Sequence, residues 1–187
     1  NSPTVKEILD FMMLWSDNVL ADRLAGLAAR AAGYSPNIKG IDTIFRTLLA
    51  QFEIDDKKLF VADASGLSKK NKITAKLMGE LLYKIRKDEK YALLYESLPI
   101  GGVSGTLQDR FTTTAPSAVG LVRAKTGTLN GTATLAGYVQ STDREYVFVT
   151  LADDIAKGNA ALNKARAAID RVLGRIAAPN IPAEISP

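Results

Sequence analysis

Residues 120–152 read GLVRAKTGTLNGTATLAGYVQSTDREYVFVTLA, and apolar side chains recur there at about every second position. This period is typical of β-strands, whose successive side chains point to opposite faces of a sheet. We expect three strands, over residues 120–127, 132–141 and 144–152. The two connections, Leu129-Asn130-Gly131 and Thr142-Asp143, are short, and Asn130-Gly131 is typical of a hairpin turn. The strands should therefore form an antiparallel meander.

Both faces of the third strand are apolar and need cover. Val147 falls on one face and Phe148 on the other. Residues 157–176 carry apolar side chains at helical spacing, so this C-terminal helix is expected to pack on the sheet. Pro179 and Pro182 then end regular structure.

The N-terminal half has helical periodicity instead. Helices are expected over residues 5–15, 19–31 and 41–52, and again after Thr74. Thr4 and Glu7 have the spacing of a capping box at the start of the first helix. Leu59-Phe60-Val61 is a candidate short strand, and Trp15 is expected in the core. The predicted fold class is α+β, an antiparallel sheet packed with the C-terminal helix, beside a helical cluster.

The composition excludes several kinds of chemistry. The chain has 187 residues, of which 47% are hydrophobic and 24% charged, and this mixture is typical of a globular domain. It contains no histidine and no cysteine, which excludes a Ser-His-Asp triad, a histidine-ligated metal and a thiol nucleophile. The net charge of +4 is too balanced for a dedicated nucleic-acid binder.

The remaining hydrolytic chemistry needs hydroxyl groups, carboxylates or lysine. Two tripeptides fit it: Ser16-Asp17-Asn18 in the break between two predicted helices, and Lys125-Thr126-Gly127 at the end of the first strand. S-D-N and K-T-G are two of the three motifs of serine β-lactamases and penicillin-binding proteins. Taken singly, the first is better explained by helix capping and the second by a solvated edge lysine, and only the combination of the two motifs favours catalytic chemistry.

The residues after Lys125 suit a substrate-binding strand edge. Gly127 has no side chain, which would allow a substrate backbone to approach and pair with the strand. Thr128 follows with a backbone N–H that is a candidate oxyanion donor.

At these motifs the sequence resembles the class C, low-molecular-mass penicillin-binding proteins, the D-alanyl-D-alanine carboxypeptidase/endopeptidase family. Four further segments carry the likeness: Asp63-Ala64-Ser65-Gly66-Leu67-Ser68, Leu98-Pro99-Ile100-Gly101-Gly102, Gly105-Thr106-Leu107 and Leu135-Ala136-Gly137-Tyr138. The resemblance implies part of a penicillin-binding, transpeptidase-like serine hydrolase domain.

The resemblance also implies a reaction and residue roles. The reaction is acyl transfer from peptidoglycan stem peptides ending in D-Ala-D-Ala, through a serine acyl-enzyme. Ser16 would relay a proton to the leaving amine, and Asn18 would hydrogen-bond the substrate's peptide group. Lys125 would supply positive charge to the Ser16 hydroxyl and to the substrate's carboxylate region. Thr126 would hydrogen-bond that carboxylate, with the Thr128 N–H as one oxyanion donor.

The same resemblance implies partners and a location. β-Lactams would acylate the same nucleophile as substrate mimics, and neither a metal nor an organic cofactor is implied. No nucleic-acid partner is expected. The expected location is extracytoplasmic, in the cell envelope or secreted.

One motif of the family is missing. The family's nucleophile and base come from S-x-x-K, and no serine of this chain has a lysine three residues later. We therefore expect residues 1–187 to be the C-terminal part of a single penicillin-binding domain that depends on the N-terminal part of the same protein and is inactive alone. Two alternatives remain open: a piece of a serine β-lactamase, and a catalytically dead cell-wall binding protein.

Overall fold

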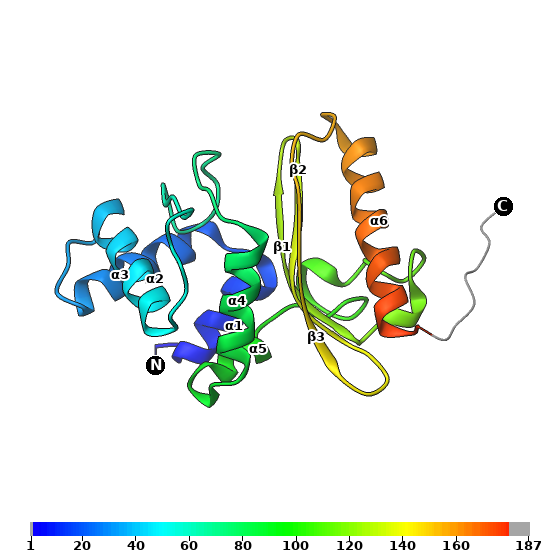
Figure 1. Ribbon diagram of the computed structural model, residues 1–187, viewed down its shortest axis with the longest axis horizontal. Helices are drawn as coiled ribbons and strands as arrows, with labels where there is room; N and C mark the ends of the chain where they lie inside the picture. The colour runs from blue at the N-terminus through cyan, green and yellow to red at the C-terminus, as the bar shows by residue number, and fades with distance from the viewer. Residues whose placement is uncertain (1, 180–187) are drawn as a thin grey trace. The chain divides into compact units, whose positions relative to one another are not determined.

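The computed structural model describes residues 2–179, and the chain forms two compact units that divide between Leu98 and Pro99 (Figure 1). Of the described residues, 2–98 form unit 1 and 99–179 form unit 2. The predicted end of regular structure at Pro182 lies outside the described residues.

Unit 1 is helical, as its periodicity predicts. The capping box is present: the Thr4 hydroxyl accepts from the Glu7 N–H, and the Glu7 carboxylate accepts from the Thr4 N–H. Thr74 caps a later helix in the same way, by accepting from the Leu77 N–H. The elements are α1 (Val5–Trp15), α2 (Asn18–Ala31), α3 (Ile38–Gln51), α4 (Ala75–Arg86), the 3-10 turn η1 (Glu89–Tyr91) and α5 (Ala92–Glu96).

Two predictions for unit 1 are wrong. Trp15 is 57% exposed rather than in the core, because it is the last residue of α1, a helix with no fully buried residue. The expected strand at 59–61 is a single antiparallel bridge between Phe60 and Lys72. One pair of residues is too short to continue as a ladder, so the segment remains a loop.

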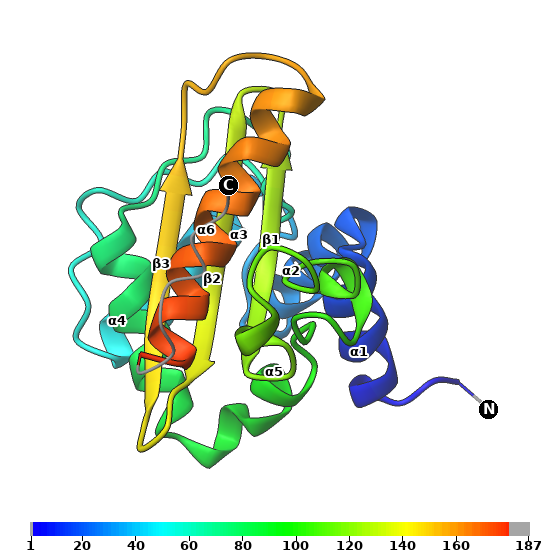
Figure 2. The same cartoon turned by 90° about the vertical axis from the view of Figure 1, so that its right-hand side faces the viewer.

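Unit 2 is a three-stranded antiparallel sheet in the order β1-β2-β3, covered on one face by α6 (Figure 2). Val122 pairs with Val139 and Leu129 with Thr132, so Asn130-Gly131 forms the predicted two-residue turn. The first strand begins two residues later than predicted. The face of each side chain follows from alternation along the strand, so this difference in bounds leaves the predicted faces unchanged. The elements are η2 (Gly105–Leu107), η3 (Pro116–Ala118), β1 (Val122–Leu129), β2 (Thr132–Gln140), β3 (Glu145–Ala152) and α6 (Asn159–Ala177).

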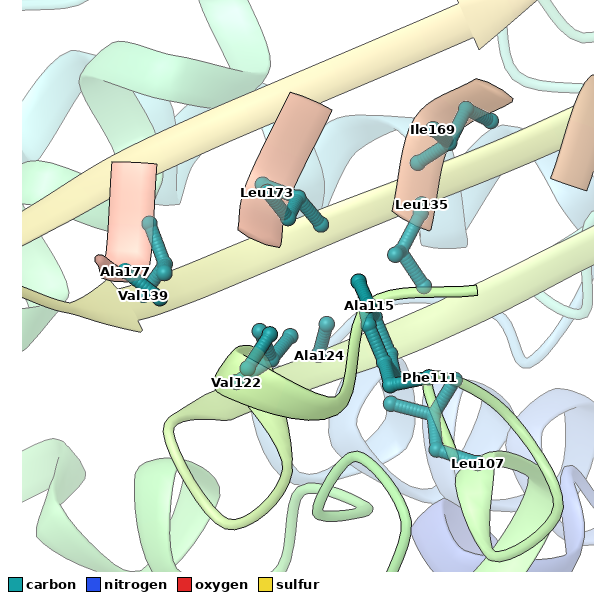
Figure 3. Close-up of a cluster of buried hydrophobic side chains, with 11 residues drawn as sticks. Leu107, Phe111, Ala115, Val122, Ala124, Leu135, Val139, Ile169, Leu173 and Ala177 are labelled. Carbon is teal, nitrogen blue, oxygen red and sulfur yellow. The ribbon is translucent and has the colours of Figure 1, made fainter. Parts of the chain in front are cut away.

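The core of unit 2 lies between the sheet and α6. Figure 3 shows Ile169 and Leu173 of α6 over Leu135 and Val139 of β2. Phe111, from the segment before the sheet, is 1% exposed and packs in the same cluster. Burying a side chain of this size contributes about 1.5–3 kcal/mol, so this cluster is the main source of stability for the sheet.

A buried ion pair connects the segment before the sheet to α6. Arg110 donates from both Nε and Nη2 to the carboxylate of Asp170, and Thr114 Oγ1 donates to the same carboxylate over 3.1 Å. Arg110 Nη2 also donates to the Arg166 carbonyl over 3.2 Å. Asp170 is 3% exposed, so water cannot replace these partners.

Replacing Asp170 with asparagine should strongly destabilise unit 2, because Arg110 then becomes a buried cation without its counter-charge. We expect Asp170→Asn to lower the free energy of unfolding by about 3–5 kcal/mol, measured by urea denaturation. The exposed Asp153→Asn is the matched control and should change it by less than about 0.5 kcal/mol. Equal effects of the two changes would contradict a role for the pair.

Candidate active site

Ser16-Asp17-Asn18 forms the junction between α1 and α2. Ser16 ends α1 in the left-handed conformation, with φ 57° and ψ 50°, and its N–H donates to the Met12 carbonyl. Asp17 caps α2 by accepting from the Leu20 N–H over 2.8 Å, and Asn18 is the first helical residue. The capping interpretation is therefore correct for Asp17. Left-handed serine is strained by about 1–3 kcal/mol, and such strain often marks functional positions.

The D-A-S-G-L-S segment, residues 63–68, is a loop that lies along the face of α2 that carries Asn18. Asp22 is four residues after Asn18 and so shares that face. Its carboxylate accepts from the N–H groups of Ala64 and Ser65, each over 2.9 Å. The loop backbone is thus held at a fixed position beside α2.

The same loop is ordered from within by Asp63. Its carboxylate accepts from the N–H groups of Gly66 and Ser68, and from Asn71 Nδ2 over 2.7 Å. Asn71 Oδ1 in turn accepts from the Ala62 N–H over 2.7 Å. The sequence motifs did not assign a structural role to Asp22, Asp63 or Asn71. For Asp63, the sequence does offer one indication of such a role: it stands at the start of a loop, where aspartate accepts hydrogen bonds from nearby backbone N–H groups.

Lys125 lies on the face of the sheet opposite α6. Val122 and Ala124 are fully buried on the α6 side, and strand alternation places Lys125 on the other face. Its Nζ donates to the Thr126 carbonyl over 3.0 Å. Burial lowers the pKa of Lys125 from 10.5 to about 8. A lysine with such a pKa exchanges its proton near neutral pH, which suits acid–base chemistry.

The outer edge of β1 is paired at its start and open further along. The Gly101 N–H donates to the Val122 carbonyl over 2.8 Å, and the Ala124 N–H donates to the Pro99 carbonyl over 3.0 Å. Alternation directs the N–H groups of Thr126 and Thr128 to this same edge. Within residues 2–179 no strand pairs with the edge there, since β1 is the outermost strand. An extended peptide could therefore add to the sheet at this position.

Gly127 has a structural reason to be glycine besides the predicted one. A Cβ at this position would lie 2.3 Å from Thr134 Oγ1 on the neighbouring strand. Thr134 uses that hydroxyl to donate to the Gly127 carbonyl over 3.4 Å. Glycine at this position thus allows Thr134 of β2 to approach β1 closely.

The predicted site residues fall into two groups. Ser16 and Asn18 lie together at the α1–α2 junction in unit 1. Lys125, Thr126, Gly127 and Thr128 lie consecutively on β1 in unit 2. Among residues 2–179 no group of three or more acidic side chains is placed to hold a metal ion, and no helix there is long and apolar enough to cross a membrane.

Solved structures with a similar fold define the class of protein fold. Penicillin binding protein 4 (dacB) from Haemophilus influenzae superposes with a TM-score of 0.81 at 30% identity, covering 89% of this chain and 38% of that one. A predatory endopeptidase from Bdellovibrio bacteriovorus, at 20% identity, gives a TM-score of 0.68 and supports the fold alone. The fold is that of the penicillin-binding serine hydrolases.

Sequence relatives narrow the class to a family. Carboxypeptidase DacB of Mycolicibacterium smegmatis is 39% identical over 150 residues, covering 78% of this chain and 32% of the relative. D-alanyl-D-alanine carboxypeptidase DacB of Haemophilus influenzae is 34% identical over 160 residues, which cover 84% of this chain and 33% of that relative. Residues 1–176 match the D-Ala-D-Ala carboxypeptidase 3 (S13) family, and the chain belongs to it. It spans about a third of the length of these relatives.

The low pKa of Lys125 predicts a pH-dependent stability. Between pH 8 and 10.5 the unfolded chain binds more protons at this lysine than the folded chain, so the free energy of unfolding should rise with pH across that window. Urea denaturation at several pH values should show this rise in the wild type and its loss in Lys125→Met. NMR detection of the Lys125 Nζ titration should give a midpoint near 8.

Lys164→Met serves as the control, because Lys164 is exposed on α6, and its pH profile should follow the wild type. A Lys125 midpoint at the ordinary value of 10.5 would contradict the assignment.

Proposed function

We propose that the protein containing this chain is a serine-type D-Ala-D-Ala carboxypeptidase and endopeptidase that acts on peptidoglycan stem peptides and binds β-lactams. The observation that carries the proposal is the open edge of β1, beside a lysine of lowered pKa, in a member of the S13 family. The names of the relatives agree with this activity.

The proposed reaction has two steps. A serine hydroxyl attacks the carbonyl carbon of the penultimate D-alanine, the peptide C–N bond breaks, and the terminal D-alanine leaves with the proton that the serine gave up. Water then hydrolyses the resulting ester and restores the serine. The nucleophile and its lysine base would come from an S-x-x-K motif, which this chain does not contain.

Residues of this chain would perform the remaining tasks. Ser16 would pass the proton to the leaving amine, and Lys125 would hold the Ser16 hydroxyl in place by its charge. Asn18 would hydrogen-bond the substrate's peptide group. Thr126 would hydrogen-bond the substrate's carboxylate, and the Thr128 N–H on the open strand edge would stabilise the oxyanion.

The partners and location follow from the same proposal. The substrate is a peptidoglycan peptide, and β-lactams are inhibitors. Residues 1–187 are the C-terminal part of a single domain, which the N-terminal part of the same protein completes. Acting on peptidoglycan requires an extracytoplasmic location. A solved structure of the Haemophilus influenzae protein contains a β-lactam, which supports the choice of inhibitor.

A β-lactamase function is not favoured by any observation. The match to the extended-spectrum β-lactamase TLA-1, at 17% identity and a TM-score of 0.55, concerns the fold alone. The S13 family match favours the peptidase.

The proton relay is tested by Ser16→Gly in the full-length protein. Glycine takes the left-handed conformation without strain, so this change removes the hydroxyl while keeping the backbone. We expect kcat/KM for D-alanine release from an acetylated D-Ala-D-Ala peptide to fall about 100-fold or more. Glu53→Gly, at another left-handed residue with φ 57°, is the matched control and should keep full activity. Wild-type activity in Ser16→Gly would exclude the relay, and a wild type without D-alanine release would exclude the function.

The need for S-x-x-K is tested by labelling with a fluorescent penicillin. The 187-residue chain should remain unlabelled after denaturing electrophoresis, because it has no serine with a lysine three residues later. The full-length protein should carry one stable label per molecule under the same conditions. A covalent label on the 187-residue chain would show that another of its hydroxyls is the nucleophile.

A further inference from the structure

One aspartate of α2 connects the Ser16-Asp17-Asn18 junction to a loop that begins 42 positions after that aspartate. Asp22 lies one helical turn after Asn18, on the same face of α2. Its Oδ1 accepts from the N–H groups of both Ala64 and Ser65, over 2.9 Å each. Because both donors are backbone groups, Asp22 fixes the main chain of the loop beside Asn18.

The loop is held together internally, so a hold at one point places all of it. Asp63 accepts from the N–H groups of Gly66 and Ser68, which ties the start of the loop to its end. Ala64 adds an apolar contact with the buried cluster that includes one face of α2. A methyl group can slide on an apolar surface, whereas two hydrogen bonds to one oxygen have a defined geometry. The bonds to Asp22 therefore set the register of the loop along α2.

The position of the loop has a cost in stability, which points to a functional reason for it. Within residues 2–179, the Ser65 hydroxyl is buried and has no hydrogen-bond partner, although the Ser65 N–H donates to Asp22. A buried hydroxyl without a partner destabilises the folded state. Ser16, in the same part of unit 1, has the strained left-handed conformation. Proteins retain such unfavourable features mainly where a functional site requires them.

We propose that Asp22 is a positioning residue of the active site: by holding residues 64–65 against α2, it fixes the orientation of the Asn18 amide that hydrogen-bonds the substrate's peptide group. The inference rests on the proposed function and adds a residue that acts through Asn18 rather than on the substrate. The negative charge of Asp22 is not needed for this role. A single oxygen, Oδ1, accepts both bonds, and the amide oxygen of asparagine can do the same.

The test is a double-mutant cycle between Asp22 and Asn18 in the full-length protein. The variants are Asp22→Ala, Asn18→Ala and the two changes together, with Asp22→Asn as the variant that keeps the acceptor oxygen. The readouts are kcat/KM for D-alanine release and the rate of acylation by penicillin. Asp42→Ala is the matched control, because it removes an aspartate that pairs with Arg46 within the same unit. Asp22 is exposed, so its replacement leaves the buried core intact, and circular dichroism checks the folded fraction.

We expect Asp22→Ala to lower both rates about 10-fold when Asn18 is present and less than about 2-fold when Asn18 is replaced, because the loop then has no amide to orient. Asp22→Asn and Asp42→Ala should both stay within about 2-fold of the wild type. An aspartate that only stabilised the fold would instead lower the rates by the same factor in both backgrounds.

Three results would each overturn the inference: equal factors in the two backgrounds, wild-type rates in Asp22→Ala, or the same loss in Asp22→Asn as in Asp22→Ala. The proposed function fails separately, because a wild type that is acylated by penicillin but releases no D-alanine is not the peptidase. In that case the cycle on the acylation rates still decides whether Asp22 acts through Asn18. A wild type that shows neither reaction would overturn both.

Discussion

The carboxylate of Asp170, a residue of α6, is buried and accepts hydrogen bonds from Arg110 and Thr114. Both partners belong to the segment before the sheet, so this one charge fixes how that segment and α6 meet. Leu173 and Phe111 can then pack in one core with β1 and β2. The position of α6 along the sheet follows, and with it the contact between Arg166 and Thr128.

The segment before the sheet also decides which part of β1 is available. It pairs with Val122 and Ala124 through Pro99 and Gly101, and it approaches the core so closely that a Cβ on Gly101 would lie 2.7 Å from the Phe111 ring. The same segment therefore blocks the start of the strand edge and leaves the part beyond it open. A substrate that pairs with β1 must do so beside Thr126 and Thr128, where hydroxyl groups and N–H donors are concentrated.

Local signals in the sequence were sufficient for most of the fold. The capping box at Thr4 and the two-residue turn at Asn130-Gly131 are formed by neighbours in the chain, and both are confirmed. Trp15 was misjudged because helical spacing shows which residues share a face but not whether another element covers that face. The strand at 59–61 was misjudged because pairing depends on a partner that composition alone does not reveal.

Within the candidate site, sequence motifs could point only to residues that are neighbours in the chain, as in Ser16-Asp17-Asn18 and Lys125-Thr126-Gly127. The contacts of Asp22 with the loop at 64–65 and of Arg166 with Thr128 were out of reach, because they join residues 42 and 38 positions apart through packing of whole elements. In the sequence, an arginine or aspartate on the polar face of a predicted helix has the same pattern whether it is solvated or makes a contact with another element.

Two cations next to β1, Lys125 and Arg166, lie on opposite sides of the sheet, and their chemistry differs. Lys125 has a pKa of about 8, so it can lose its proton under the conditions in which the enzyme would work. Arg166 keeps its charge across the same range, because a guanidinium is not deprotonated in proteins. The proposed role of Lys125 depends on its positive charge and is therefore sensitive to pH above about 8, whereas the contact of Arg166 with Thr128 is not.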